Sequence, residues 1–494
     1  MTALPKRSGR IGAAAGALVL SGANIIRLAI QLALLPVLAR LVGPAEYGLV
    51  ALAVPFVLLC NVLADGGLGA ALARRQSPSP ELESTVFWLA GAIGAGLTLA
   101  VCLAAWPIGL ALRQPRLPLL IVAIAPILVL SGFTAAANAR VIREQRFTVF
   151  AAGDLISCLT SGAAALWTAA HGWGAWSLAV QQLVLWVFKF IWVVSASRLP
   201  IRLCCRPSEA ADLLRFGGHS IGATLGDFVA RNLDNVIVGG VLGAQALGYY
   251  AMAYQIIRVP DLVISGPLYL FIFSGVANAV GRSSGQATDI AMAALRLAVM
   301  ALAPLFVGLG LLAGPAVAVV LGAKWLGAID TLAWLSLAGL AFSLNSVVAA
   351  VLMGLGRSEL QLRMAMISGV GAVAAVAVGV RLGVAAAGAA LALTTLAITL
   401  AYLATLAKAL KVSWTVLANA LWPAATAAAA MTFALLTARP VLATLSPALG
   451  LVSGVVLGGA TYCAAAAILS RRQVLADLVA FRSADQDHAS AAAI

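Results

Sequence analysis

Apolar stretches of helix-spanning length alternate along the whole chain with short clusters of charged and turn-forming residues. Inside hydrocarbon, every backbone polar group needs a partner, so a stretch of this kind must form a helix or a strand of a closed barrel. Barrel strands would alternate polar and apolar residues over about ten positions, and the stretches lack that alternation. The pattern predicts an all-α integral membrane protein of about fourteen transmembrane helices, over residues 14–38, 47–64, 84–106, 117–137, 148–170, 174–196, 214–242, 247–275, 289–313, 328–352, 361–380, 384–407, 414–436 and 445–469.

The lysines and arginines orient these helices independently of hydropathy. Cytoplasmic loops of polytopic proteins collect Lys and Arg. With both termini in the cytoplasm, most of the 31 lysines and arginines fall on the cytoplasmic side. The opposite side receives few, namely Arg40, Arg113, Arg116, Lys324, Arg381 and Arg439. We therefore expect a multi-pass protein of the bacterial inner membrane with both termini cytoplasmic. The segment 313–328 is irregular, and we expect a broken segment there.

Composition and charge exclude several classes of function. The chain is 63% hydrophobic and 10% charged, with a net charge of +14, whereas soluble domains carry about 25% charged residues. Cytoplasmic loops account for the positive charge, so we expect no nucleic-acid partner. Cysteines and histidines lack metal-ligand spacing, and no phosphate-binding loop or nucleophile elbow occurs. The outer loops are too short for a separate active site, so we expect no metal, no cofactor and no enzymatic activity.

An internal repeat divides the chain. The segment Leu41–Ala53 recurs as Val241–Ala253, and two glycines of each copy align, Gly43 with Gly243 and Gly48 with Gly248. Each copy joins a long helix to the next through a turn that suits Gly and Pro. Six predicted spans separate the copies, so both halves have the same orientation, which is the parallel-repeat arrangement of some transporters. We predict a substrate crevice between two six-helix lobes, and four parts in all: an N-terminal lobe (1–200), a C-terminal lobe (201–411), two additional helices (412–470) and a cytoplasmic tail (471–494).

Polar side chains inside the first predicted span form a stripe. Asn24, Arg27 and Gln31 fall within about a third of the helix circumference. A charge at mid-bilayer costs about 2.5–3.5 kcal/mol on insertion scales. Because its own helix offers Arg27 no carboxylate, it must pair across the bundle or meet a bound anion, and we predict a substrate-binding role for it.

A second stripe lies in the seventh span, and a separate charged pair lies in the eighth. The spacings Asp227–Arg231 (i,i+4) and Arg258–Asp261 (i,i+3) allow neighbouring charges to neutralise each other. A structural role and a substrate-binding role both stay open for these groups. The predicted cavity residues are Arg27, Arg231, Arg258, Asp234, Asn235, Asp227, Asn24 and Gln31.

Three further ionisable residues lie nearer the cytoplasmic ends of their spans: Asp154, Lys189 and Arg296. Long side chains near helix ends extend toward the interface. For these three we expect such snorkelling, or pairing with a loop, rather than a place in the cavity.

Short motifs follow one another in a consistent order over much of the chain. They are Leu38–Gly48, Asp65–Leu68, Gly172–Leu178, Arg231–Asn235, Leu242–Gly243, Ala246–Tyr250, Gly322–Trp325 and Gly354–Arg357. Through these motifs the chain resembles the Wzx-like polysaccharide flippases of the multidrug/oligosaccharidyl-lipid/polysaccharide exporter superfamily, and most of all the colanic-acid-exporter branch. It departs from the family where a proline is expected near Phe273-Ser274, and its last two helices match in hydropathy alone.

The resemblance implies a fourteen-helix fold that moves a polyprenyl-diphosphate-linked oligosaccharide across the inner membrane by alternating access, for exopolysaccharide or lipopolysaccharide biosynthesis. Membrane lipids and a polysaccharide polymerase are the other partners it implies. Arginines suit a diphosphate because the guanidinium fork matches phosphate oxygens. Two rivals stay open: a cation-coupled multidrug exporter of the same superfamily, and a membrane polysaccharide polymerase or ligase.

Overall fold

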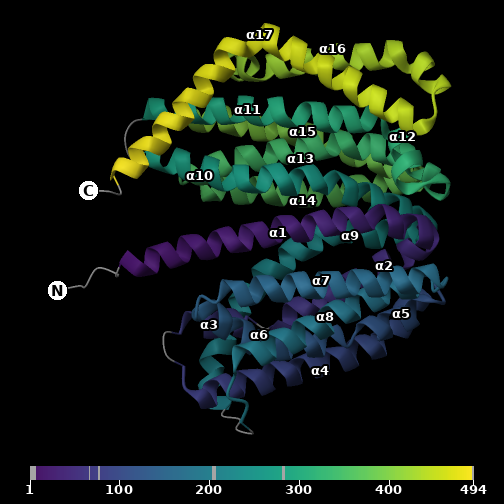
Figure 1. Cartoon of the computed structure of the whole chain (residues 1–494), viewed down its shortest axis with the longest axis vertical. Coiled ribbons are helices and arrows are strands. Elements are labelled where there is room, and N and C mark those ends of the chain that lie inside the picture. The colour runs from purple at the N-terminus through teal and green to yellow at the C-terminus, as the bar shows by residue number, and fades with distance from the viewer. Residues whose placement is uncertain (1–6, 66, 76–77, 203–206, 281–283, 492–494) are drawn as a thin grey trace. The chain divides into compact units, whose positions relative to one another are not determined.

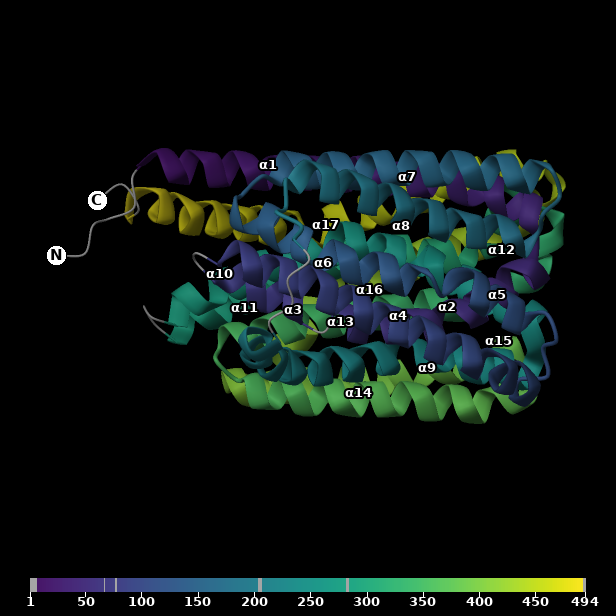
Figure 2. The ribbon, with the colours of Figure 1, turned by 90° about the horizontal axis from the view of Figure 1, so that it is seen from below.

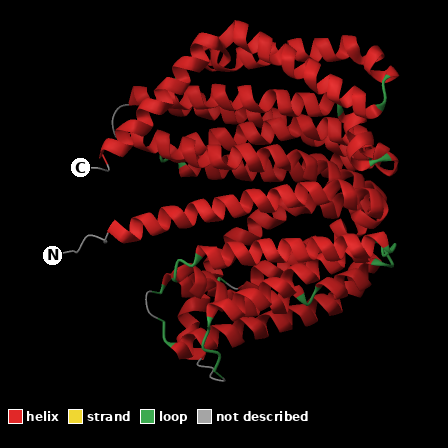
Figure 3. Cartoon of the chain, viewed as in Figure 1, coloured by secondary structure: helices red, strands yellow, loops and turns green. Residues whose placement is uncertain are grey.

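All the regular structure in the described part of the chain is helical (Figure 3). The computed structural model describes the backbone of residues 7–65, 67–75, 78–202, 207–280 and 284–491, and the side chains within these ranges except those of 7–18, 62, 65, 70, 207–231, 267, 284 and 471–491. Among the described residues, 13 helical runs are long and apolar enough to cross a membrane. The predicted all-α membrane fold is confirmed.

The seventh and eighth predicted spans meet at Gly243. This glycine has φ +84° and ψ 178°, which are not helical, so a kink divides α9 (Pro207–Pro260) into two helices. The second of them continues through the π-helix η1 (Asp261–Ser265) into α10 (Gly266–Val280). The apolar stretch Asn232–Val280 crosses this kink and therefore contains parts of two predicted helices, which reconciles the 13 runs with the fourteen predicted helices.

The chain forms two compact units, Met1–Gly248 and Tyr249–Ile494. The four-part division and the crevice between lobes stay predictions. The first unit contains α1 (Arg7–Val42), α2 (Pro44–Asp65), α3 (Leu68–Arg74), α4 (Pro80–Ala111), α5 (Leu117–Ile124), α6 (Ile127–Arg143), α7 (Phe147–Ala170), α8 (Ala175–Ser197) and the part of α9 up to Gly248.

Small residues let the helices of the first unit pack closely. Helix α7 packs along both α1 and α8, and α6 packs along α4 and α8 (Figures 1 and 2). A Cβ at Gly132 of α6 would overlap the backbone of Ala90 in α4, and one at Gly91 would overlap the Phe133 ring. Glycine brings helix backbones together in this way where both lie in lipid.

Glu46 ties three segments together at one end of the first unit. It lies in the first turn of α2. Arg116 donates from Nη1 and Nη2 to its two carboxylate oxygens, at 2.6 and 3.0 Å. The backbone N–H of Ala175, the first residue of α8, donates to Glu46 Oε2 at 2.9 Å. The carboxylate thus fixes the start of α8 and the segment before α5 to α2.

At the other end of this unit, a buried carboxylate joins α4 to α6. The Glu83 side chain of α4 is 4% exposed. Arg140 Nη1 of α6 donates to its Oε2 at 2.9 Å, and Arg143 donates to Oε1. Glu144 pairs with Arg140 from the outside at 2.9 Å. Two arginines of α6 therefore neutralise the one buried charge of α4.

The repeated glycines adopt matching conformations. Gly43 has φ +77° and Gly243 has φ +84°, a region that favours glycine. Gly48 lies against the Ala244 backbone, and Gly248 lies against the Pro44 backbone. Because each repeated glycine contacts the other copy of the turn, the local part of the predicted repeat is confirmed.

The second unit is built around α13. Helix α13 packs on α10, α11 and α15, and α17 packs on α16. The fully buried Trp325 ring meets Tyr249 edge-on at 6.3 Å. The broken segment expected at 313–328 is confirmed, since three short helices occupy it. Beyond α9, η1 and α10, this unit contains α11 (Ser284–Leu311), α12 (Ala313–Ala316), η2 (Val317–Leu321), η3 (Ala323–Ala328), α13 (Ile329–Gly354), α14 (Ser358–Gly379), η4 (Val380–Leu382), α15 (Val384–Leu410), α16 (Trp414–Thr444) and α17 (Pro447–Ala491).

Candidate functional site

Three ionisable side chains from three helices meet inside the membrane-spanning part of the first unit. Asp154 of α7 lies between Lys189 of α8 and Arg27 of α1. Lys189 Nζ is 2.9 Å from Asp154 Oδ1, and Arg27 Nη1 is 3.8 Å from Asp154 Oδ2. Counted from the C-terminal ends of α1 and α7 and from the start of α8, each of the three lies about 15 residues along its helix, or about 22 Å at 1.5 Å per residue. We call Arg27, Asp154 and Lys189 the charge triad.

Aromatic rings hold the Lys189 side chain in place. Its ammonium lies 5.3 Å from the Phe150 ring centroid and 5.8 Å from the Trp186 ring centroid. Both distances are within the range of cation–π attraction, which is stronger where water is excluded. The side chains of Lys189 and Asp154 are only 19% and 16% exposed. This half of the charge triad is a tight, enclosed ion pair.

Arg27 is held more loosely. Its side chain is 41% exposed, and its contact with Asp154 is 0.9 Å longer than that of Lys189. Asn24 and Gln31, one turn before and one turn after it on α1, are also exposed. The predicted stripe of α1 therefore presents one guanidinium between two amides. The carboxylate expected from across the bundle is Asp154.

The charge triad has one more positive charge than negative. Arg27 and Lys189 share the single carboxylate. Charges inside a membrane are costly and mark substrate or ion pathways unless they are neutralised by each other. The arrangement can therefore take up one further negative charge.

The predicted site residues beyond α1 all belong to α9. The side chains of Asp227 and Arg231 are outside the described residues. Asp234 is 8% exposed and its Oδ1 accepts from the backbone N–H of Asn235 at 2.8 Å. Arg258 is exposed.

Arg258 does not form the ion pair with Asp261 that the i,i+3 spacing allows, as far as the described residues show. Asp261 instead accepts a hydrogen bond from Ser343 of α13, at 3.2 Å. It is the first residue of the π-helix η1. Its carboxylate therefore joins η1 to α13.

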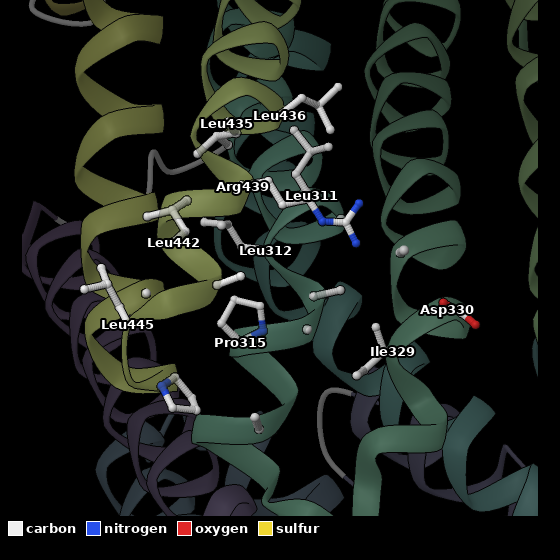
Figure 4. A pocket seen from close by; sticks show the side chains of 18 residues that line it. Leu311, Leu312, Pro315, Ile329, Asp330, Leu435, Leu436, Arg439, Leu442 and Leu445 are labelled. Atoms are coloured by element: carbon white, nitrogen blue, oxygen red, sulfur yellow. The ribbon is translucent and has the colours of Figure 1, made fainter.

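The second unit contains a cavity of about 510 Å³ between α11, α13, α16 and α17. Its wall is mostly apolar, and Leu312 and Leu435 also line a smaller apolar cavity of about 310 Å³. Two charged residues line it, Arg439 and Asp330, and Figure 4 shows the Asp330 carboxylate pointing away from Arg439. It has no cluster of facing polar groups like the charge triad.

The sequence singles out Arg27 but not its partners. Snorkelling or loop pairing is expected for Asp154 and Lys189, whereas the structure brings them together inside the bundle. Their equal depth in the membrane is the signal that could have paired these two residues. Helices α7 and α8 are joined by the short loop 171–174, and both residues lie about 15 positions from it, so antiparallel packing brings them level.

Comparison with known proteins agrees with this fold. Residues 37–330 match the family model described as "Polysaccharide biosynthesis protein". The succinoglycan biosynthesis transport protein ExoT of Rhizobium meliloti is 25% identical over 67% of each chain. The lipopolysaccharide biosynthesis protein WzxC of Escherichia coli is 23% identical over 69% of this chain and 70% of that one.

Solved structures extend the similarity to nearly the whole chain. The lipid II flippase MurJ, in an inward closed conformation, superposes with a TM-score of 0.73 at 14% identity, over 92% of this chain and 99% of that one. An inward-facing multidrug transporter of the MATE family gives 0.59 at 17% identity, over 79% and 99%. The family model matches more than half of this chain. The chain therefore belongs to the polysaccharide biosynthesis proteins and has a membrane transporter fold.

Proposed function

We propose that this protein translocates a polyprenyl-diphosphate-linked oligosaccharide across the bacterial inner membrane for surface polysaccharide biosynthesis, by alternating access, with both termini in the cytoplasm. Support comes from the family and from the two relatives, whose names place them in succinoglycan and lipopolysaccharide biosynthesis. The delivered unit is what a polysaccharide polymerase on the outer side would consume.

One observation carries the proposal: the charge triad has two cations and one carboxylate within the membrane span. A diphosphate is the anionic part of such a substrate, and an arginine binds phosphate oxygens through its planar fork of donors. The exposed Arg27 is the group we assign to the diphosphate. Asn24 and Gln31 beside it offer amide donors and acceptors for phosphate or sugar hydroxyls.

The predicted residues of α9 complete the proposal. We assign Arg231 and Arg258 to the anionic head group. Asp227, Asp234 and Asn235 orient these arginines or contact sugar hydroxyls. Arg27 is the residue to test first, because it lies beside the second cation and the carboxylate of the charge triad.

The test uses a strain that lacks its own exporter, complemented with wild type, Arg27→Ala, Arg27→Lys or Arg381→Ala. Arg381 is an exposed arginine of the second unit and serves as the matched control. Surface polysaccharide and the lipid-linked repeat unit retained in the membrane are both quantified. We expect wild type and Arg381→Ala to restore polymer. Arg27→Ala loses hydrogen bonds to a charged group, worth about 1.5–3 kcal/mol, so its transport should fall at least about tenfold.

Arg27→Lys should give an intermediate result, because lysine keeps the charge but lacks the fork. If wild type changes neither the polymer nor the retained lipid-linked unit, the flippase proposal is wrong. If Arg27→Ala restores polymer as well as wild type does, transport does not use Arg27.

The rival function, cation-coupled drug export, requires a binding site of the opposite charge. Cationic drugs need a site with net negative charge, and the charge triad is net positive. Ethidium accumulation in cells should therefore be the same with and without this protein. Lower accumulation with the protein would favour drug export.

A further inference from the structure

Asp154 does not share its charge equally between its two partners. Lys189 lies 2.9 Å away and is enclosed by Phe150 and Trp186, whereas Arg27 lies 3.8 Å away with 41% of its side chain exposed. Coulomb attraction falls with distance and with exposure to solvent. Arg27 is therefore the partner that can turn away, and Lys189 is the one that keeps Asp154 in place.

An anion that binds Arg27 comes close to the Asp154 carboxylate. The two negative groups then compete for one guanidinium, and like charges a few ångströms apart repel each other. Binding of the anion and pairing with Asp154 are thus coupled, each weakening the other by the same factor. The carboxylate lowers the affinity of the site and favours release.

We propose that Asp154 is an internal counter-anion: it neutralises Arg27 in the empty transporter, is displaced by a substrate phosphate, and reclaims Arg27 as the substrate leaves. This inference rests on the proposed function. It makes Asp154 a positioning residue that sets the balance between binding and release, with Lys189 fixing it at the right distance. A transporter needs that balance because a substrate held too tightly on one side is not delivered on the other.

A purely structural charge triad predicts something different. In that case Asp154 only joins α1, α7 and α8, and removing it weakens the fold without tightening anion binding. The two roles are separated by measuring affinity and stability on the same purified full-length protein in nanodiscs. The probe is farnesyl diphosphate, a soluble prenyl diphosphate, with binding followed by calorimetry.

Asp154→Asn should bind the probe about tenfold more tightly, a change of about 1.4 kcal/mol. In cells its transport should saturate at lower substrate and reach a lower maximal rate. Arg27→Ala/Asp154→Asn should lose the gain, because the guanidinium that the carboxylate competes for is gone. Glu144→Gln, which removes a carboxylate from an ion pair at the end of α6, is the control and should leave affinity unchanged.

A second pair of variants keeps the proposal testable if Asp154→Asn is unstable. Lys189→Met leaves Asp154 with Arg27 alone, so the probe should bind more weakly than to wild type. Lys189→Met/Asp154→Asn removes a whole ion pair and keeps the net charge, a change that proteins often tolerate. It should bind the probe at least as well as wild type.

Unchanged or weaker binding by folded Asp154→Asn, or binding by the Lys189→Met/Asp154→Asn double variant that is weaker than that of wild type, would overturn the counter-anion role. Failure of the proposed function looks different: wild type itself would not bind farnesyl diphosphate and would not restore polysaccharide.

Discussion

The contact between the two repeated turns gives a sharp prediction about Gly48. This glycine is buried near the start of α2. A Cβ added there would lie 2.7 Å from the carbonyl carbon of Ala244 and from the backbone nitrogen of Gly248, and closer still to the Ala244 oxygen. Ordinary contacts begin at 3.4 Å, so Gly48→Ala must separate two backbones by at least about 0.7 Å in a close-packed interior.

The magnitude follows from two opposing effects. Overpacking a close-packed interior costs about 1–3 kcal/mol, and backbone atoms cannot rotate away as a side chain can. Alanine in a helix gains about 0.5–1 kcal/mol over glycine. Gly96, inside α4, has nothing within 4 Å of an added Cβ. Gly96→Ala therefore keeps the gain without the clash, and the two variants should differ by about 2–3 kcal/mol.

The assay is the apparent thermal midpoint of the purified protein in detergent. At about 2–4 °C per kcal/mol for a unit of this size, the midpoint of Gly48→Ala should lie about 5 °C or more below that of Gly96→Ala. Gly248→Ala meets the Pro44 backbone in the same way and should match Gly48→Ala. The double variant should cost less than the sum, because both substitutions act on one contact. A Gly48→Ala midpoint at or above that of Gly96→Ala would refute the reasoning.

Three further substitutions test the packing, each read from the same thermal midpoint. Glu83→Gln removes the 4%-exposed partner of two arginines and should lower the free energy of unfolding by about 3 kcal/mol. Glu144→Gln, at a 35%-exposed side chain, should lower it by less than about 1 kcal/mol. Equal losses of stability would contradict the burial argument. Trp325→Ala empties a fully buried site and should cost about 3–5 kcal/mol, against a negligible loss for Trp414→Ala, whose ring is 54% exposed. Arg116→Ala breaks an exposed bidentate pair with Glu46 and should cost about 1 kcal/mol or less. A larger loss would mean that Arg116 also keeps Glu46 in position to bind the start of α8.

The fold was predictable because the membrane restricts the choice of structure. Stretches of apolar residues had to be helices, and most observed spans begin and end within about five residues of the predicted ones, as for 148–170 against Phe147–Ala170, although Trp414–Thr444 extends eight residues beyond the predicted end. The predicted boundary between the seventh and eighth spans coincides with the kink at Gly243. The repeat marks this boundary, because a single positive-φ glycine replaces the polar loop that usually separates two spans.

The candidate site was predictable only in part. Arg27 stands out because no carboxylate lies on its helix; of the two alternatives, a partner across the bundle or a bound anion, the structure shows the first, and the substrate-binding role stays a prediction. Position along a single span gives no reason to pair Asp154 with Lys189. Hydropathy also cannot give the rotation of a helix about its axis, which decides whether a charge faces lipid or a neighbouring helix.

Depth counted from a shared loop would have paired the two missed residues. Helices joined by a short loop lie antiparallel and adjacent, so residues at equal distances from the loop lie at the same level of the membrane. Asp154 and Lys189 meet this condition across the loop 171–174, with opposite charges and about four turns from it on each side. A lone charge in a span carries the full free-energy cost of leaving water. Two opposite charges at one depth on neighbouring helices neutralise each other and so lower that cost. The question to ask of a membrane sequence is therefore which ionisable residues share a depth across a short loop. Here that criterion selects Asp154 and Lys189, and Arg27 is the second cation that contacts Asp154.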